Sequence, residues 1–310
     1  MITYARAKSP YGPFESYPLN PVVTNRDLGG HQSRIQGIGH GDLVQTEDGT
    51  TFIVCLGFRQ EGMWMPFHHL GREVFLVPVQ WQQDGWFTAG VNGKVEAEME
   101  MNLNASGEDT CYDVSFEKLG ADSLRWCHLR AYDQANYQFT EQGAKLRGNH
   151  FTLDDVDAPT FLGVRQSEFD TTLDVTVGGN SPEAGVTFYL CEDHHYDLYL
   201  AQADGGSRAE LRLTTGDAQC VKASVPLEQG QQEVKLHVES DEEIYTFFAE
   251  IAGEKKELGK ARTKYLSSEV AGGFTGTVMA MYAVNPEEKE DAWGEFTGLN
   301  WTMKKWVDNA

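Results

Sequence analysis

Three features of this 310-residue chain have residue types that could do chemistry. Asp193, His194 and His195 are consecutive and could hold a metal ion. Arg72 carries a guanidinium, whose fork can donate to two hydroxyl groups at once and stays charged at any working pH. Phe274 lies between glycines that permit a tight, projecting loop, where a ring could form an apolar wall. We interpret the Asp193–His195 run as the start of a strand with solvated histidines rather than as a metal site.

The cysteines do not form a metal or redox motif. The chain has 5 cysteines, at positions 55, 111, 127, 191 and 220, and no CxxC pair. Their odd number and wide spacing favour reduced, mostly buried thiols in a cytoplasmic protein. The alternative is one or two disulfides, for which the spacing shows no framework.

The charge balance excludes two classes of partner. With 25 Lys+Arg against 47 Asp+Glu, the formal net charge is −22. Such a surface repels phosphate backbones and anionic lipid, so we expect neither nucleic-acid binding nor membrane binding. The sequence also shows no apolar run near the length of a membrane span and no secretory signal at its start. Neutral substrates such as sugars remain compatible with this charge.

The elements that must position these residues are predicted to be strands. Short segments rich in β-branched and aromatic residues recur between Gly, Asp and Asn turns, and no stretch keeps a helical apolar period for three turns. Asp48-Gly49, Asp84-Gly85 and Asn92-Gly93 are typical hairpin turns. The clearest predicted strands span residues 51–59, 72–81, 123–130, 160–166, 184–192, 195–203, 243–251 and 276–284.

The sequence pattern differs between the two parts of the chain. Residues 1–102 mix strands with long loops rich in Pro, Gly and His, whereas residues 103–310 show strands at the regular short spacing of an antiparallel sandwich. The join, around residues 93–108, is acidic and has little core pattern. We therefore predict two domains, with the boundary after residue 102.

An ordered set of segments in the first hundred residues resembles a known family. The segments are YARAKSPYGPFE (4–15), NPVVTNRD (20–27), IQGIGHGDLVQTEDGTTFIVCLGFR (35–59) and HHLGREVFLVPVQWQQDGWF (68–87). They resemble the later blades of the catalytic propeller of glycoside hydrolase family 43, in its β-xylosidase and α-L-arabinofuranosidase branch. Residues 152–170, 195–200 and 264–283 resemble the C-terminal β-sandwich of the same branch.

The resemblance implies an all-β fold, in which a five-bladed β-propeller precedes a lectin-like, concanavalin-type β-sandwich. It implies hydrolysis of xylosides or arabinosides in xylan-derived oligosaccharides, with inversion at the anomeric carbon. Inversion uses two carboxyl groups roughly 6.5–9.5 Å apart, one an acid and one a base that activates water. In this family an additional Asp tunes the acid.

The sequence departs from the family pattern at these carboxylates. In the family all three precede the segment that matches residues 4–15, close to Met1 of this chain. At roughly 40–45 residues per blade, residues 1–102 make about two blades. We therefore expect a partial propeller without the catalytic base Asp and acid Glu, and an active enzyme would need the other blades, for instance from a separate chain.

The resemblance also implies roles for four residues. His40 would lie at the propeller centre and help to hold the tuning Asp, with a calcium or sodium ion near it in some relatives. Arg72 would reach the sugar, Phe274 of the sandwich would close one wall of the pocket, and Gln36 would line its mouth. The alternatives are a satisfied core histidine for His40, pairing of Arg72 with a neighbouring carboxylate, and an ordinary turn aromatic for Phe274. No other cofactor is expected.

Two further functions stay open at this point. The sandwich could be a non-catalytic glycan-binding module, or the whole chain an inactive remnant. The choice between xyloside and arabinoside is not decided by these residues.

Overall fold

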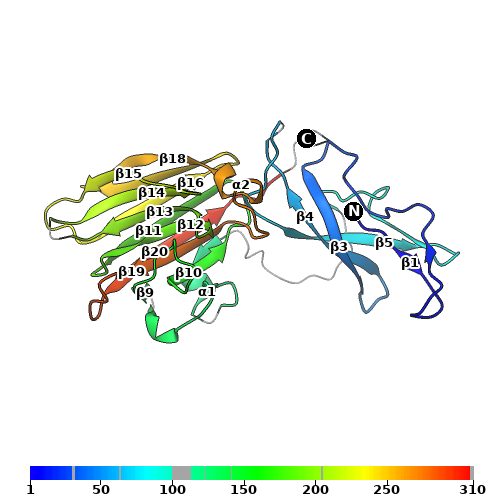
Figure 1. The fold of residues 1–310 in the computed structure, drawn as a ribbon, viewed down its shortest axis with the longest axis horizontal. Coiled ribbons are helices and arrows are strands. Elements are labelled where there is room, and N and C mark those ends of the chain that lie inside the picture. Colours follow the sequence, from blue (N-terminus) through cyan, green and yellow to red (C-terminus); the bar gives the residue numbers. More distant parts are fainter. Residues whose placement is uncertain are drawn as a thin grey trace. The chain divides into compact units, whose positions relative to one another are not determined.

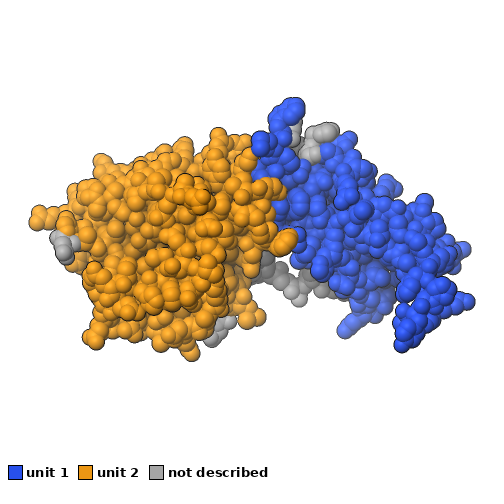
Figure 2. Space-filling view, in the orientation of Figure 1, with its two compact units in different colours: residues 1–106, 307–310 blue, residues 107–306 orange. Residues whose placement is uncertain are grey.

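The structure is a computed structural model that describes residues 1–29, 32–62, 64–99, 113–121, 123–140, 142–203 and 205–307. The chain divides into two compact units, residues 1–106 with 307–310 and residues 107–306 (Figure 2). Strands form nearly all of the regular structure (Figure 1), so the prediction of an all-β chain is confirmed. The boundary predicted after residue 102 and Cys111 lie outside the described residues.

The first unit contains an antiparallel sheet in the order β3-β4-β5-β6, which is the strand arrangement of a propeller blade. Two of the three predicted hairpin turns lie between its strands, where Gly49 and Gly85 take φ of 89° and 79°. The third, Asn92-Gly93, follows β6 and lies within the isolated bridge between Val91 and Lys94. A separate ladder joins β1 to β2. The bounds are β1 Ala5–Arg6, β2 Glu15–Ser16, β3 Ile35–Gln45, β4 Thr51–Arg59, β5 Glu73–Trp81 and β6 Phe87–Ala89.

One face of this sheet packs into the core of the unit. Ile35, Ile53 and Val77, from three neighbouring strands, are at most 2% exposed and pack with Trp86 and Val23. The opposite face is less covered, because Val44 and Val74 are exposed.

The second unit consists of two antiparallel sheets. In the described part of the chain one sheet has six strands, in the order β10-β19-β12-β13-β14-β15. The other has eight, in the order β18-β17-β16-β11-β20-β9-β8, with β7 also paired to β20. The first sheet comprises β10 Thr160–Arg165, β12 Glu183–Cys191, β13 His194–Ala201, β14 Arg208–Thr215, β15 Ala218–Pro226 and β19 Val278–Val284. The second comprises β7 Asp113–Ser115, β8 Tyr137–Thr140, β9 Gly143–Arg147, β11 Thr171–Gly179, β16 Val234–Ser240, β17 Ile244–Ile251, β18 Glu254–Arg262 and β20 Trp293–Met303.

The two sheets bury a shared core. Phe188 and Leu198 of the six-stranded sheet meet Phe247, Phe296 and Trp301 of the eight-stranded sheet, and none of these side chains is exposed. Alternate residues of each strand supply this core, as expected for a sandwich. The helical pieces are single turns, at α1 Phe116–Leu119, α2 Ser268–Ala271, η1 Gln134–Asn136 and η2 Thr263–Leu266.

One strand prediction is wrong. Residues 123–130 form turns and a single isolated bridge, between Cys127 and Gly163, rather than a strand. The Cys127 amide donates to the Gly163 carbonyl at 2.8 Å, and Gly163 donates back at 2.9 Å. Trp126 of this segment packs against the shared core, and His128 Nδ1 lies 2.9 Å from the Phe161 carbonyl of β10, so the segment contacts the edge of the sheet without extending it.

The prediction that the histidines at the start of β13 are solvated is also wrong. His195 is completely buried, with Nδ1 2.9 Å from an oxygen of Asp197 and Nε2 3.0 Å from an oxygen of Asp154. Arg212 donates from Nε to Asp197 at 2.8 Å and from Nη2 to Glu183 at 2.6 Å. The five residues form an ion-pair network on the face of the six-stranded sheet opposite the shared core.

Two further sequence features can be placed. Cys55 is buried, Cys127 and Cys191 are half-buried and Cys220 is exposed, and all four are free thiols. Across the described ranges, no helix is long and apolar enough to cross a membrane.

Candidate functional site

The candidate site lies on β3 and on the loop that leads into β5. Strand β3 is irregular here, because its register against β4 shifts between Gln36 and Gly39 and again between Gly39 and Asp42. Gly37 takes φ of 67°, and His40 takes φ of 51°, which few non-glycine residues adopt. His40 is exposed within this chain. The bulged segment turns the His40 side chain out of the regular alternation of the strand.

Pairing between strands brings Gln36 and Arg72 to the same end of the sheet. Gln36 is opposite Phe58 on β4, and Glu73 on β5 is opposite Gly57, so Arg72 continues the row next to Phe58. Arg72 is exposed at this end. The Gln36 amide nitrogen donates to the carbonyls of Leu28 at 3.2 Å and Ser33 at 3.0 Å. Gln36 therefore holds the loop that precedes β3, to which Leu28 and Ser33 belong.

The loop before Arg72 is held by its two histidines. His68 stacks on Phe58, with ring centroids 4.0 Å apart and ring planes 10° apart. His69 is fully buried, and its Nδ1 lies 2.9 Å from a carboxylate oxygen of Glu61. These contacts anchor the loop on the sheet and so fix the position from which Arg72 projects. The sequence did not single out Phe58 or Glu61, because their partners depend on register and loop path.

The two carboxylates nearest to the motifs, Glu73 and Asp42, have different surroundings. Glu73 accepts from Arg59, with Nη2 at 2.7 Å and Nε at 3.0 Å, in a forked ion pair. Asp42 is exposed on β3.

Phe274 belongs to the second unit. It follows Gly272 and Gly273, both with φ of 76°, and its side chain is 73% exposed. The loop thus projects the ring into solvent from the unit that carries it. The structure brings Gln36, His68 and Arg72 together within the first unit, and it describes Phe274 only within the second.

The part of the chain that the structure describes does not by itself make a metal site. Among the described residues, no group of three His, Cys, Asp or Glu side chains is placed to hold an ion. An exposed His40 alone offers one nitrogen, whereas calcium takes six to eight oxygen ligands. A calcium or sodium ion near His40 would therefore need ligands from outside these residues.

Replacing Gly37 by alanine is expected to distort this site. A Cβ at Gly37 would lie 2.1 Å from the Phe58 ring, and the backbone has φ of 67°. Backbone strain and overpacking together predict that the free energy of local unfolding, in which β3 separates from β4, falls by about 2–4 kcal/mol. Hydrogen exchange of the β4 amides would measure it. The matched control is Gly49→Ala, with φ of 89° and no atom within 4 Å of the new Cβ, which should lose only about 1 kcal/mol. Equal effects of the two substitutions would contradict the packing role of Gly37.

Comparison with known proteins identifies the class of both units. Residues 1–87 match the family described as glycosyl hydrolases family 43, and residues 115–301 match the β-xylosidase C-terminal concanavalin A-like domain. The chain therefore belongs to glycosyl hydrolase family 43, as its sequence motifs predicted. The partial propeller followed by a concanavalin-type sandwich is likewise confirmed.

The relatives that the chain matches are named as arabinofuranosidases and xylosidases. A non-reducing end α-L-arabinofuranosidase of Bacteroides ovatus is 35% identical over 310 residues, which are 95% of this chain and 57% of that protein. A xylosidase/arabinosidase of Butyrivibrio fibrisolvens is 26% identical, over 96% of this chain and 58% of that protein. The solved structure of the Bacteroides ovatus xyloglucan PUL GH43B protein matches with a TM-score of 0.87 and 32% identity, covering 97% of this chain and 60% of that one. The chain thus spans less than two thirds of the length of these relatives.

Proposed function

We propose that this chain forms the substrate-binding and supporting part of an inverting glycosidase that acts on xylan-derived xylo- or arabino-oligosaccharides. The observation that carries the proposal is the ordered pair of family matches, over residues 1–87 and 115–301, in a chain that spans 57% of its arabinofuranosidase relative. One blade-like sheet and a two-stranded ladder are less than a five-bladed propeller contains.

In this proposal the acid, the base and the tuning Asp come from blades outside this chain. They could belong to a longer form of the same polypeptide or to a separate chain. Support comes from Glu73, which is held by Arg59, and from Asp42, which is exposed and has no motif match. The other blades would place two carboxyls on opposite faces of the scissile bond, with room between them for the attacking water.

The part of this chain is to bind and orient the sugar. Arg72 donates to two sugar hydroxyls, which holds the ring in one orientation for in-line attack. His40 hydrogen-bonds the tuning carboxylate and keeps it ionised. Gln36 supports the loop at the mouth, and Phe274 supplies an aromatic wall that stacks on an apolar sugar face and excludes water.

We also propose that the chain works in the cytoplasm. The support is that Cys55, Cys127, Cys191 and Cys220 are free thiols, which suits a reducing compartment.

Complementation tests the proposed function. The purified chain alone should not hydrolyse p-nitrophenyl β-xyloside or p-nitrophenyl α-L-arabinofuranoside above background. Joined to the part of the Bacteroides ovatus arabinofuranosidase that it does not span, it should hydrolyse at least one of them, with a product of inverted anomeric configuration by NMR. The control is that part of the relative without this chain.

Two results would overturn the proposal. Robust turnover by the purified chain alone would require an acid and base among its own residues. A folded, joined protein that hydrolyses neither substrate would remove the sugar-binding role of this chain.

A further inference from the structure

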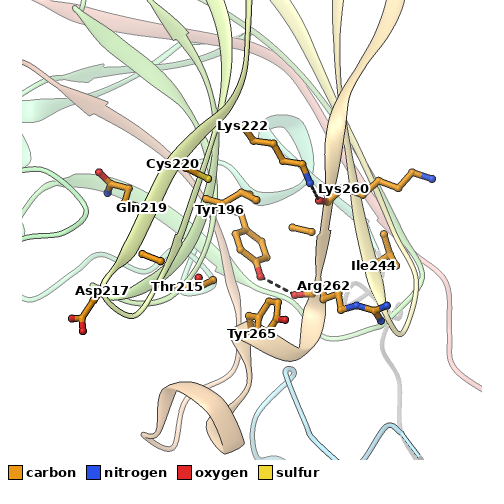
Figure 3. Close-up of a pocket in the computed structure, with 13 residues that line it drawn as sticks. Tyr196, Thr215, Asp217, Gln219, Cys220, Lys222, Ile244, Lys260, Arg262 and Tyr265 are labelled. Atoms are coloured by element: carbon orange, nitrogen blue, oxygen red, sulfur yellow. Dashed lines mark hydrogen bonds between the residues drawn. The ribbon is translucent and has the colours of Figure 1, made fainter.

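A cavity of about 570 Å³ opens between the ends of the two sheets of the sandwich. It lies between β15 and β18, each of which is the last strand of its sheet (Figure 3). All of its lining residues belong to the second unit, and none has a part in the proposed sugar site. Its volume falls within the roughly 300–1,000 Å³ of small-molecule pockets.

The packing of the edge strands explains why the sandwich is open here. Gly259 of β18 lets the chain of Lys222 lie close, since a Cβ at Gly259 would be 3.0 Å from the Lys222 Cε. Lys222 then reaches across to donate from Nζ to the main-chain carbonyl of Lys260 (Figure 3). Beyond this contact the lining positions Ala218 and Ala261 have small side chains. Space that larger residues would fill is thereby left between the sheets.

The walls of the cavity are mainly apolar and aromatic. Leu213 and Ile244 contribute aliphatic surface, and Tyr196 and Tyr265 contribute rings. Tyr196 is 1% exposed, and its hydroxyl donates to the main-chain carbonyl of Arg262 at 2.8 Å (Figure 3). Burial raises the pKa of Tyr196 well above its usual range, so the phenol stays neutral. A ligand inside the cavity would therefore contact aliphatic side chains and the faces of aromatic rings.

The charge at this cavity is opposite to that of the whole chain. The lining includes Lys222, Lys260, Arg262 and one carboxylate, Asp217, in a chain of net charge −22. In Figure 3 the side chains of Lys260 and Arg262 point away from Tyr196, and Arg262 lies 3.7 Å from Glu243, so Lys222 is the cation that faces the cavity. In Figure 3 the carboxylate of Asp217 points away from Tyr196, whereas Lys222 extends over the cavity. No carboxylate in the described ranges pairs with Lys222. Its ammonium has three donors, so it can bind an anion and keep its bond to Lys260.

We propose that this cavity binds a small organic acid with an aromatic body. The ring system packs between Leu213, Ile244 and Tyr265, and the carboxylate is bound by Lys222 at the mouth. Charge selects for an acid, because the acidic surface repels anions elsewhere on the chain and a local cation offsets that repulsion. Shape selects for a flat body, because the cavity is confined between two sheets.

Calorimetry with the whole chain tests the proposal, using naphthalene-2-carboxylate as the probe and the neutral naphthalene-2-carboxamide as its match. The acid should bind at least tenfold more tightly than the amide. Ala218→Trp should abolish binding of both by filling the cavity. Lys222→Met, which keeps the packing over Gly259, should weaken the acid at least tenfold and leave the amide unchanged. Lys256→Met, on the same β18 but outside the cavity lining, is the control and should bind the acid like wild type.

Labelling of Cys220 provides a readout that needs no variant. This exposed thiol lines the cavity, so saturating naphthalene-2-carboxylate should slow its reaction with N-ethylmaleimide at least fivefold, as followed by peptide mass spectrometry. The half-buried Cys191 should be unaffected. Equal affinity for acid and amide, binding that survives Ala218→Trp in a folded variant, or an unprotected Cys220 would each overturn the proposal.

Discussion

Replacing Arg72 by alanine is expected to lower kcat/KM of the complemented enzyme about 100-fold or more, for whichever of the two p-nitrophenyl glycosides it hydrolyses. A hydrogen bond from a charged group contributes about 1.5–3 kcal/mol, and the guanidinium would make two to the sugar. Every 1.4 kcal/mol corresponds to about tenfold in rate or affinity. Steady-state kinetics would measure the loss. A fall in kcat beyond the rise in KM would indicate contacts that strengthen in the transition state.

Two variants separate this role from a structural one. Arg72→Lys keeps the charge and loses the fork, so it should give an intermediate loss. Arg26→Ala removes an exposed arginine of the same unit and should leave kcat/KM unchanged. If Arg72→Ala stayed within threefold of wild type, Arg72 would not be a sugar ligand.

Replacing Asp197 by asparagine is expected to lower the free energy of unfolding of the sandwich by about 3–5 kcal/mol. Asp197 is completely buried between His195 and Arg212, and removing one partner of a buried ion pair leaves an uncompensated charge. Urea denaturation followed by circular dichroism would measure the change. The control is Glu295→Gln, whose more exposed ion pair with Lys145 should contribute less than about 1 kcal/mol.

The ion pair between Asp197 and His195 also predicts that the free energy of unfolding of the sandwich depends on pH. Asp197 and Asp154 raise the pKa of His195 to about 9 against the cost of burial, from a usual value of 6.5. The stability that this gives is fully present below pH 6.5 and is lost as the pH rises through about 9. In Asp197→Asn this loss should shrink, because the main charge that raises the pKa is gone. A wild-type sandwich equally stable at pH 6 and pH 10 would contradict the assignment.

The fold could be predicted from the sequence wherever the signal is local. The Asp48-Gly49 and Asp84-Gly85 turns were predicted from turn chemistry, and β4 from its run of β-branched and aromatic residues over 51–59. Residues 123–130 form no strand, because this segment has no β-branched residue and makes only the isolated bridge between Cys127 and Gly163.

The candidate site could be predicted only in part, because its motifs are local whereas its contacts depend on residues distant in sequence. Gln36 and Arg72 were singled out from motifs, and the register of β3, β4 and β5 places them in one row. His195 was misjudged because its partners are Asp154, 41 positions earlier, and Asp197 on its own strand face. Such burial depends on the neighbouring chain that covers the sheet, which a local pattern does not record.

The position of β20 has a consequence for how the sandwich forms. This strand, Trp293–Met303, lies between β11 and β9 in its sheet, although it is the last strand in the described sequence. During synthesis β9 and β11 leave the ribosome more than a hundred residues before the strand that joins them. Until it arrives, both keep an unpaired edge, so folding of this sheet is late and depends on contacts distant in sequence. The nascent chain is therefore open to aggregation through those edges until β20 has been synthesised.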